Sequence, residues 1–155
     1  MDRPLKFAGL GTSLAINAYR TLKLLALAIK VNFELDLLWE LSRELRFIAG
    51  NNILEELKLD VDVRGDTSCL TKSEGWSALD SVLTESGAFP MLHRVSVEIW
   101  WWYTGSENLD DCEATLESSK EDKFPRLLES KAVEFNFSNV VSWDWQQWTG
   151  IDVFD

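Results

Sequence analysis

Four segments of the chain alternate apolar and polar residues, and each predicts a β-strand. The clearest is residues 53–63, ILEELKLDVDV, where from Leu57 onward every second residue is leucine or valine and the residues between are charged. A period of two is typical of a strand with one buried face. The same pattern occurs in residues 21–31, 95–103 and 127–137. The positions expected to face the core are Leu25, Leu27, Ile29, Val31, Leu57, Leu59, Val61, Val63, Val95, Val97, Ile99, Trp101, Tyr103, Val133, Phe135 and Phe137.

Between these segments the apolar residues recur every three or four positions, which predicts helices. Residues 34–50 and 73–87 each hold an apolar stripe that ends shortly before a glycine, Gly50 or Gly87. We expect these glycines to terminate the helices, because glycine readily adopts the positive φ of a helix C-cap. Residues 107–120 predict a third helix. The stripes consist of Leu35, Leu38, Leu41, Leu45 and Ile48; Trp76, Leu79, Val82 and Leu83; and Leu109, Cys112 and Leu116.

The strand segments share a preceding leucine, which indicates a repeat. Leu22, Leu54 and Leu92 each stand three residues before the first core-facing position, 32 and 38 residues apart. The fourth copy fits only with a one-residue slip near Leu127 and Leu128. Alternating strands and helices favour a parallel sheet, because parallel strands need a crossover connection. We therefore expect an α/β fold, a short leucine-rich-repeat-like solenoid of three to four strand–helix units; an ordinary open four-stranded α/β sheet is the alternative.

The repeat pattern divides one domain of 155 residues into three parts. Residues 1–19 predict a helical N-terminal cap, and residues 20–137 hold the strand–helix repeats. Residues 138–155 are rich in tryptophan, and we expect them to fold back as a C-terminal cap, because the terminal units of a repeat array need covering.

The strand positions that face away from the predicted core form the candidate functional site. Asp60 and Asp62 share this face with Glu98 and Glu134 of later segments, which predicts an acidic stripe. Such a stripe is either a solvated surface, a docking surface for a basic segment of a protein partner, or a metal or active site. We take docking as the candidate role. The residues assigned to it are Lys58, Asp60, Asp62, Ser96, Glu98, Trp100, Glu134 and Asn136.

Three consecutive tryptophans end the third strand segment. Alternation predicts that Trp101 faces the core and that Trp100 and Trp102 lie on the outer side. The outer pair either covers the edge of the core or forms a binding hot spot.

The net charge limits the classes of partner. The formal charge is −11, from 26 acidic and 15 basic residues. This argues against binding to nucleic acid or to an anionic membrane, and it favours a basic protein partner. Cys69 and Cys112 are too few for a disulfide framework, so we expect two thiols in a reducing compartment. The N-terminus shows no signal-peptide pattern, so we expect a cytoplasmic or nuclear protein, and no pattern specifies its oligomeric state.

Motifs for cofactor or metal chemistry are absent from the sequence. His93 is the only histidine, and no phosphate-binding glycine motif or spaced cysteine–histidine set occurs. We therefore expect no cofactor, no metal and no enzymatic activity. The rival hypotheses are a non-functional fragment of a larger chain and a small α/β enzyme, whose site would lie at the carboxyl ends of the strands. That site would hold Asp62, Arg64, Asp66, Trp102 and Tyr103.

Two motifs recur around the strands. GWSALDSVL (75–83) carries Trp-x-x-Leu-Asp, and FPMLHRVSVEI (89–99) carries Phe-Pro-x-Leu, which recurs in FPRLLESKAVEF (124–135). With NNILEELKLDV (51–61), they resemble the leucine-rich-repeat-like region of fungal F-box proteins, over about residues 20–137. The resemblance implies a protein-binding surface like their substrate-recognition region. Because nothing before residue 20 resembles the F-box module, recruitment of a ubiquitin ligase is not implied. Proline in each Phe-Pro pair is expected to end a helix and begin an extended segment.

Overall fold

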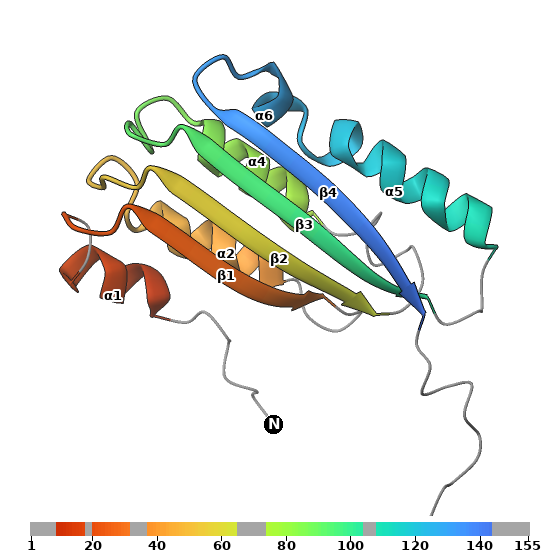
Figure 1. Ribbon diagram of the computed structural model, residues 1–155. Helices are drawn as coiled ribbons and strands as arrows, with labels where there is room; N and C mark the ends of the chain where they lie inside the picture. Colours follow the sequence, from red (N-terminus) through yellow and green to blue (C-terminus); the bar gives the residue numbers. More distant parts are fainter. Residues whose placement is uncertain (1–8, 18–19, 32–36, 65–73, 104–107, 144–155) are drawn as a thin grey trace, which may run out of the picture.

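Four parallel strands form one sheet in the part of the chain that the structure describes (Figure 1). The structure is a computed structural model, and it describes residues 9–17, 20–31, 37–64, 74–103 and 108–143. The strands lie in chain order, β1-β2-β3-β4, and every neighbouring pair is parallel. Their bounds are Leu24–Val31 (β1), Glu56–Arg64 (β2), Arg94–Tyr103 (β3) and Glu134–Trp143 (β4). The predicted α/β fold with a parallel sheet is confirmed.

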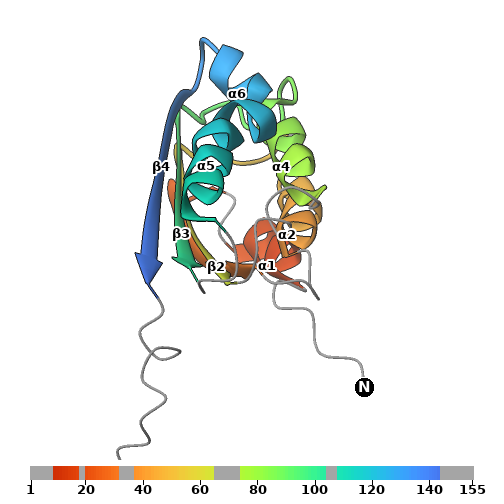
Figure 2. The ribbon, with the colours of Figure 1, turned by 90° about the vertical axis from the view of Figure 1, so that its right-hand side faces the viewer.

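The helices lie on one side of this sheet, so the molecule has two layers (Figure 2). A parallel sheet requires crossovers, and here each crossover contains a helix on the same face. The described helices are α1 (Leu10–Asn17), α2 (Leu37–Arg46), α4 (Gly75–Thr84), α5 (Leu109–Lys123) and α6 (Pro125–Glu129).

The core lies between the sheet and the helices, as the alternation predicts. Leu25, Leu57, Val95 and Phe135 are aligned across the four strands. The core-facing positions of the two central strands, from residue 57 to 63 and from 95 to 101, are at most 1% exposed. Phe135 is only partly buried, because β4 lies at the end of the sheet. The best-packed part of the fold is therefore the central pair of strands.

The turns that follow α2 and α4 are tied to each other. Gly50 and Gly87 have the positive φ angles expected of them, 81° and 77°, but α2 already ends at Arg46 and α4 at Thr84, so these glycines shape the turns and do not cap the helices. The N–H of Gly50 donates a hydrogen bond to the carbonyl oxygen of Ala88 at 2.7 Å. The buried Asn52 donates from Nδ2 to the carbonyl oxygens of Ile48 (2.8 Å) and Ala88 (2.9 Å). One asparagine side chain thus joins two successive strand–helix units.

Helix α1 packs against α2 through a glycine. A Cβ atom at Gly11 would collide with the backbone carbonyl of Glu44, so only glycine fits this contact. The N–H of Gly11 also donates to Oε2 of Glu44 at 2.9 Å. The rest of the predicted N-terminal cap, residues 1–8 and 18–19, lies outside the described residues.

The fourth unit departs from the predicted repeat. Because Phe135 is aligned with Val95, the position of the repeated leucine falls on the exposed Ala132. Leu127, which the sequence analysis placed near that position, is instead buried in α6. Pro125 is the first residue of α6 rather than the start of an extended segment, because the fixed φ of proline suits the first helical position.

The last strand is longer than predicted. It continues through residues 138–143 to Trp143, so these residues extend the sheet and do not fold back as a cap. Val140 and Val141 favour this outcome, because β-branched residues fit a pleated strand. The remainder of the predicted cap, residues 144–155, lies outside the described residues.

Candidate functional site

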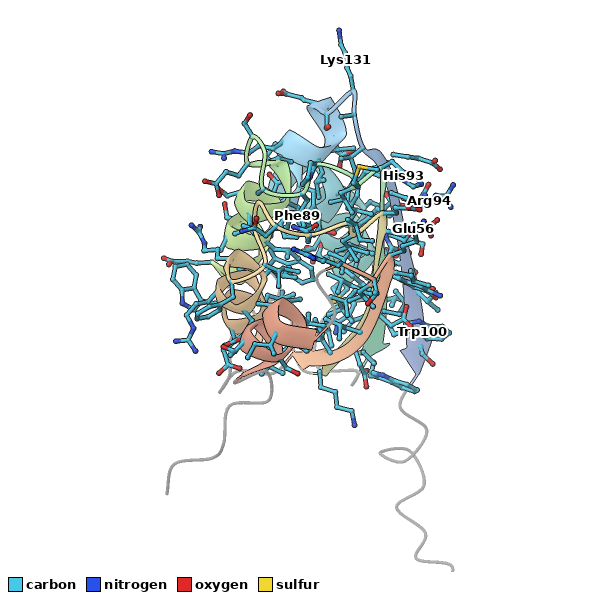
Figure 3. The ribbon with its side chains drawn as sticks, turned by 90° about the vertical axis from the view of Figure 1, so that its left-hand side faces the viewer. Glu56, Phe89, His93, Arg94, Trp100 and Lys131 are labelled. Atoms are coloured by element: carbon cyan, nitrogen blue, oxygen red, sulfur yellow. The ribbon has the colours of Figure 1, made fainter. Side chains whose placement is uncertain are left out.

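The sheet face opposite the helices carries all eight predicted site residues. Figure 3 shows Glu56, Arg94 and Trp100 pointing away from the helical layer. Successive rows of this face take one residue from each strand, in the order β1 to β4. The first four rows are Leu24, Glu56, Arg94, Glu134; Ala26, Lys58, Ser96, Asn136; Ala28, Asp60, Glu98, Ser138; and Lys30, Asp62, Trp100, Val140.

Arg94 holds two carboxylates in the first row. Its Nη1 lies 3.1 Å from Oε1 of Glu56, and its Nε lies 3.6 Å from Oε2 of Glu134. These groups are substantially exposed, so the pairs contribute little to stability. Their effect is on the charge of the surface, because Arg94 offsets the negative charge at this end of the face.

A second ion pair precedes the first row. Lys23 Nζ lies 2.9 Å from Oε1 of Glu55, and this contact lowers the pKa of the Glu55 carboxyl, with a smaller contribution from His93. His93 is exposed, and its Nδ1 lies 3.4 Å from the carbonyl oxygen of Met91. The only histidine in the sequence therefore lies at the amino ends of the strands, away from the aspartates of later rows.

The acidic cluster, which we define as Asp60, Asp62 and Glu98, occupies the third and fourth rows. Asp60 on β2 is directly opposite Glu98 on β3, and Asp62 follows Asp60 on the same face. Side chains opposite each other on adjacent strands are close neighbours, so negative charge is concentrated here. Oδ1 of Asp60 is shielded from solvent, and no described residue donates a hydrogen bond to it.

The prediction that Glu134 belongs to one acidic stripe with Asp60, Asp62 and Glu98 is wrong. Glu134 is two rows away from the acidic cluster and is ion-paired with Arg94. The position on β4 beside Glu98 is Ser138. Glu134 shares a face of the sheet with the other acids, but the register of β4 separates it from them.

The three tryptophans divide between the two faces, as predicted. Trp101 is 1% exposed in the core, whereas Trp100 is 40% exposed on the open face. Trp102 lies two residues further along the same face and is partly buried. Both outer tryptophans line a hollow of about 330 Å³, together with Asp60 and Asp62. The tryptophans and the acids thus meet in one place, which neither pattern predicts alone.

A second hollow of about 250 Å³ lies between β3 and β4. It is lined by four residues of the predicted site, Lys58, Ser96, Glu98 and Asn136, and it adjoins the acidic cluster through Glu98. Lys120 of α5 also lines this hollow. The sequence alone does not place Lys120 there, because its position depends on how α5 packs beside the edge strand.

Two further residues of the open face were missed by the sequence analysis. Arg94 holds the ion pairs of the first row, and Lys30 of β1 lines the tryptophan hollow opposite Asp62. The signal for both was present, because each continues the period-two alternation of its strand. Both add positive charge to a face that was expected to be predominantly acidic.

The residues of the enzyme hypothesis are only partly brought together. Asp62 and Trp102 line the same hollow near the carboxyl ends of β2 and β3. Arg64 and Tyr103 end these two strands, but their side chains lie outside the described part of the structure, as does Asp66 entirely. Among the described residues, no group of three or more His, Cys, Asp or Glu side chains is arranged to hold a metal ion.

Cys112 is fully buried in α5 as a thiol, whereas Cys69 lies outside the described residues. The described helices include none with the length and apolar character needed to cross a membrane. Comparison with known proteins gave no matching family model, no matching curated protein and no matching solved structure. The site must therefore be interpreted from its own chemistry.

Proposed function

We propose that this chain is a non-enzymatic protein-interaction domain that binds a basic segment of a protein partner on its open sheet face. The observation that carries the proposal is the juxtaposition of Asp60 with Glu98 on adjacent strands, beside the exposed Trp100. Clustered acids steer and orient a basic partner, and a partly exposed tryptophan supplies apolar contact area. The face is supported by a well-packed core, so it presents these side chains in a fixed arrangement.

The proposal includes a finer description of the fold. We infer a short leucine-rich-repeat-like solenoid, similar to the substrate-recognition region of fungal F-box proteins. The alignment of Leu25, Leu57 and Val95 with constant register supports it, as does the tie from Asn52 to Ala88 between successive turns. Repeat arrays of this kind use a continuous sheet face to bind extended protein segments.

Selection of peptides from a random display library on the immobilised chain tests the proposed function. We expect enrichment of peptides rich in arginine and lysine. The double substitution Asp60→Lys with Glu98→Lys should leave unfolding cooperative. It should weaken the binding of the selected peptides by about tenfold or more, because two attractive charges become repulsive.

A matched control distinguishes the effect of charges on the open face from the effect of the total charge of the chain. Glu74→Lys with Glu85→Lys makes the same change of charge at exposed positions flanking α4, in the helical layer on the other side of the sheet (Figure 2). We expect this control to weaken the binding of the selected peptides by no more than about threefold, since distant exposed charges are screened by salt. Equal losses in the two double variants would contradict the proposed binding face.

A further inference from the structure

The hollow beside Trp100 is built by side chains of very different size on three neighbouring strands. Ala28 of β1 lies directly opposite Asp60 of β2, and its single methyl group leaves space beside the carboxylate. In the next row Asp62 lies opposite Trp100, whose indole forms a wall of the hollow. Trp102 adds a second aromatic wall, at a spacing of roughly 6.6 Å along the strand. The volume of about 330 Å³ suits one side chain rather than a large ligand.

The lining of the hollow favours an organic cation. Asp60 and Asp62 provide carboxylate oxygens on one side, and the two indoles provide aromatic faces that attract positive charge. A metal ion would gain nothing from tryptophan, which is not a ligand for the common metals. Lys30, opposite Asp62, also lines the hollow, but Asp60, Asp62 and the neighbouring Glu98 outnumber it, so the local charge remains negative. Oδ1 of Asp60 accepts no hydrogen bond from any described residue, so it is available to accept one from a bound cation.

We propose that this hollow receives the side chain of an arginine from the protein partner. This inference rests on the proposed function and names the chemistry of one contact within it. The guanidinium group is planar, so it stacks on an indole and donates several hydrogen bonds in its own plane to carboxylates. Lysine offers a compact ammonium, which neither stacks nor binds two oxygens in a fork. Arginine therefore matches the combination of Trp100, Asp60 and Asp62 better than lysine does.

Titration of the full chain with Nα-acetyl-arginine amide, followed by the NMR signals of the indole N–H groups, tests this inference. The spectra of the Trp100→Phe and Trp102→Phe variants identify the two signals. We expect both to shift and to saturate with a dissociation constant of about 1–10 mM. Nα-acetyl-citrulline amide, a neutral analogue of nearly the same shape, should bind at least tenfold more weakly. The lysine derivative should bind at least about threefold more weakly than the arginine derivative.

Two controls make the titration specific. Trp39 is 54% exposed on α2, which belongs to the helical layer on the other side of the sheet (Figure 2), so its indole signal should not follow the arginine titration. Asp60→Asn should weaken binding about fivefold or more, and the unchanged dispersion of the backbone amide signals would verify that this variant is folded. Equal binding of the citrulline analogue, or an equal shift of Trp39, would overturn the inference.

Failure of this inference is distinguishable from failure of the proposed function. The titration uses a single amino-acid derivative, whereas the proposed function is measured with selected peptides. Suppose that binding of the selected peptides depends on Asp60 and Glu98, but the arginine derivative does not shift the indole signal of Trp100. This result would overturn the arginine subsite while supporting the binding face. In the opposite case, the arginine derivative shifts only Trp100 and Trp102, but the selected peptides bind equally well to the variant with Asp60→Lys and Glu98→Lys. That result would overturn the proposed face and with it the assignment of the arginine to a partner.

Discussion

The carboxylate of Asp80 in α4 accepts a hydrogen bond from the backbone N–H of Leu127 at 2.9 Å, across 47 positions of the sequence. Its second oxygen accepts from the N–H of Arg126 at 3.1 Å. Both donors belong to the first turn of α6, where helix N–H groups have no partner within the helix. Asp80, which is the aspartate of the Trp-x-x-Leu-Asp motif, therefore caps a helix of the next unit.

Asp80→Ala should destabilise the fold by about 0.5–2 kcal/mol, the usual cost of removing a helix cap. The reason is that the N–H groups of Arg126 and Leu127 lose their acceptor, and that of Leu127 is buried. Urea unfolding followed by circular dichroism measures the change. Ser77→Ala, at an exposed position of the same helix, serves as the control and should change stability by less than about 0.5 kcal/mol. Equal stability of the Asp80→Ala variant and the wild type would show that α6 needs no cap from α4.

The same carboxylate predicts a dependence of stability on pH. Burial raises the pKa of Asp80 above its ordinary value of 3.8, although the N–H groups of Leu127 and Arg126 act in the opposite direction. A raised pKa in the folded state means that the contribution of Asp80 is largest below pH 3.8 and falls as the pH rises through the folded value. In Asp80→Asn this loss is absent, so the stability of the variant relative to the wild type should increase as the pH rises from below 3.8 through the folded-state pKa. A relative stability that decreases over this range would mean that the pKa is lowered in the folded state.

Asn52→Ala should destabilise the fold by about 1–3 kcal/mol, because it leaves buried backbone groups without hydrogen-bond partners. The lost contacts are those from Nδ2 to the carbonyl oxygens of Ile48 and Ala88, and that from the N–H of Leu54 to Oδ1 at 3.2 Å. Asn51→Ala changes the exposed neighbouring residue and should cost much less. Thermal unfolding of the two variants in parallel measures the difference. Similar midpoints would indicate that the turns do not depend on the Asn52 side chain.

Glu134→Lys should weaken binding of a basic peptide less than Glu98→Lys does. Glu134 lies two rows from the acidic cluster and is already paired with Arg94, whereas Glu98 lies beside Asp60. Fluorescence titrations with the same peptide at low and physiological salt would compare the two single variants. We expect a threefold or greater gap at low salt that narrows as salt is added, since exposed charges are screened. An equal effect of the two substitutions would favour a binding surface that extends over the whole face.

The parts of the fold that the sequence predicts are those encoded locally. Alternation alone identifies the buried faces of β2 and β3, and helical spacing identifies α2 and α4, because these patterns depend on neighbouring residues. The register of β4 is different, since Ala132 occupies the place of the repeated leucine and removes the marker for alignment. For the same reason the pairing of Arg94 with Glu134 could not be predicted.

The site was partly predictable in the same way. Which residues lie on the open face follows from the alternation, and all eight are found there. Which of them are neighbours depends on the pairing of strands that are more than 30 residues apart, as for Asp60 and Glu98. The contact of Asp80 with α6 is also outside any local pattern, because it requires the packing of helices from two units.

The order of the strands has a consequence for how the chain is made. Because β1 to β4 lie in the sheet in the order in which they occur in the chain, each strand after β1 emerges from the ribosome when one strand with which it pairs has already been made. From β2 onward, no strand must wait for a later one before it can pair, so the sheet can grow during translation by adding one edge at a time. Asp80 likewise emerges before the helix that it caps. The nascent chain therefore always offers a finished edge as the template for the segment that follows.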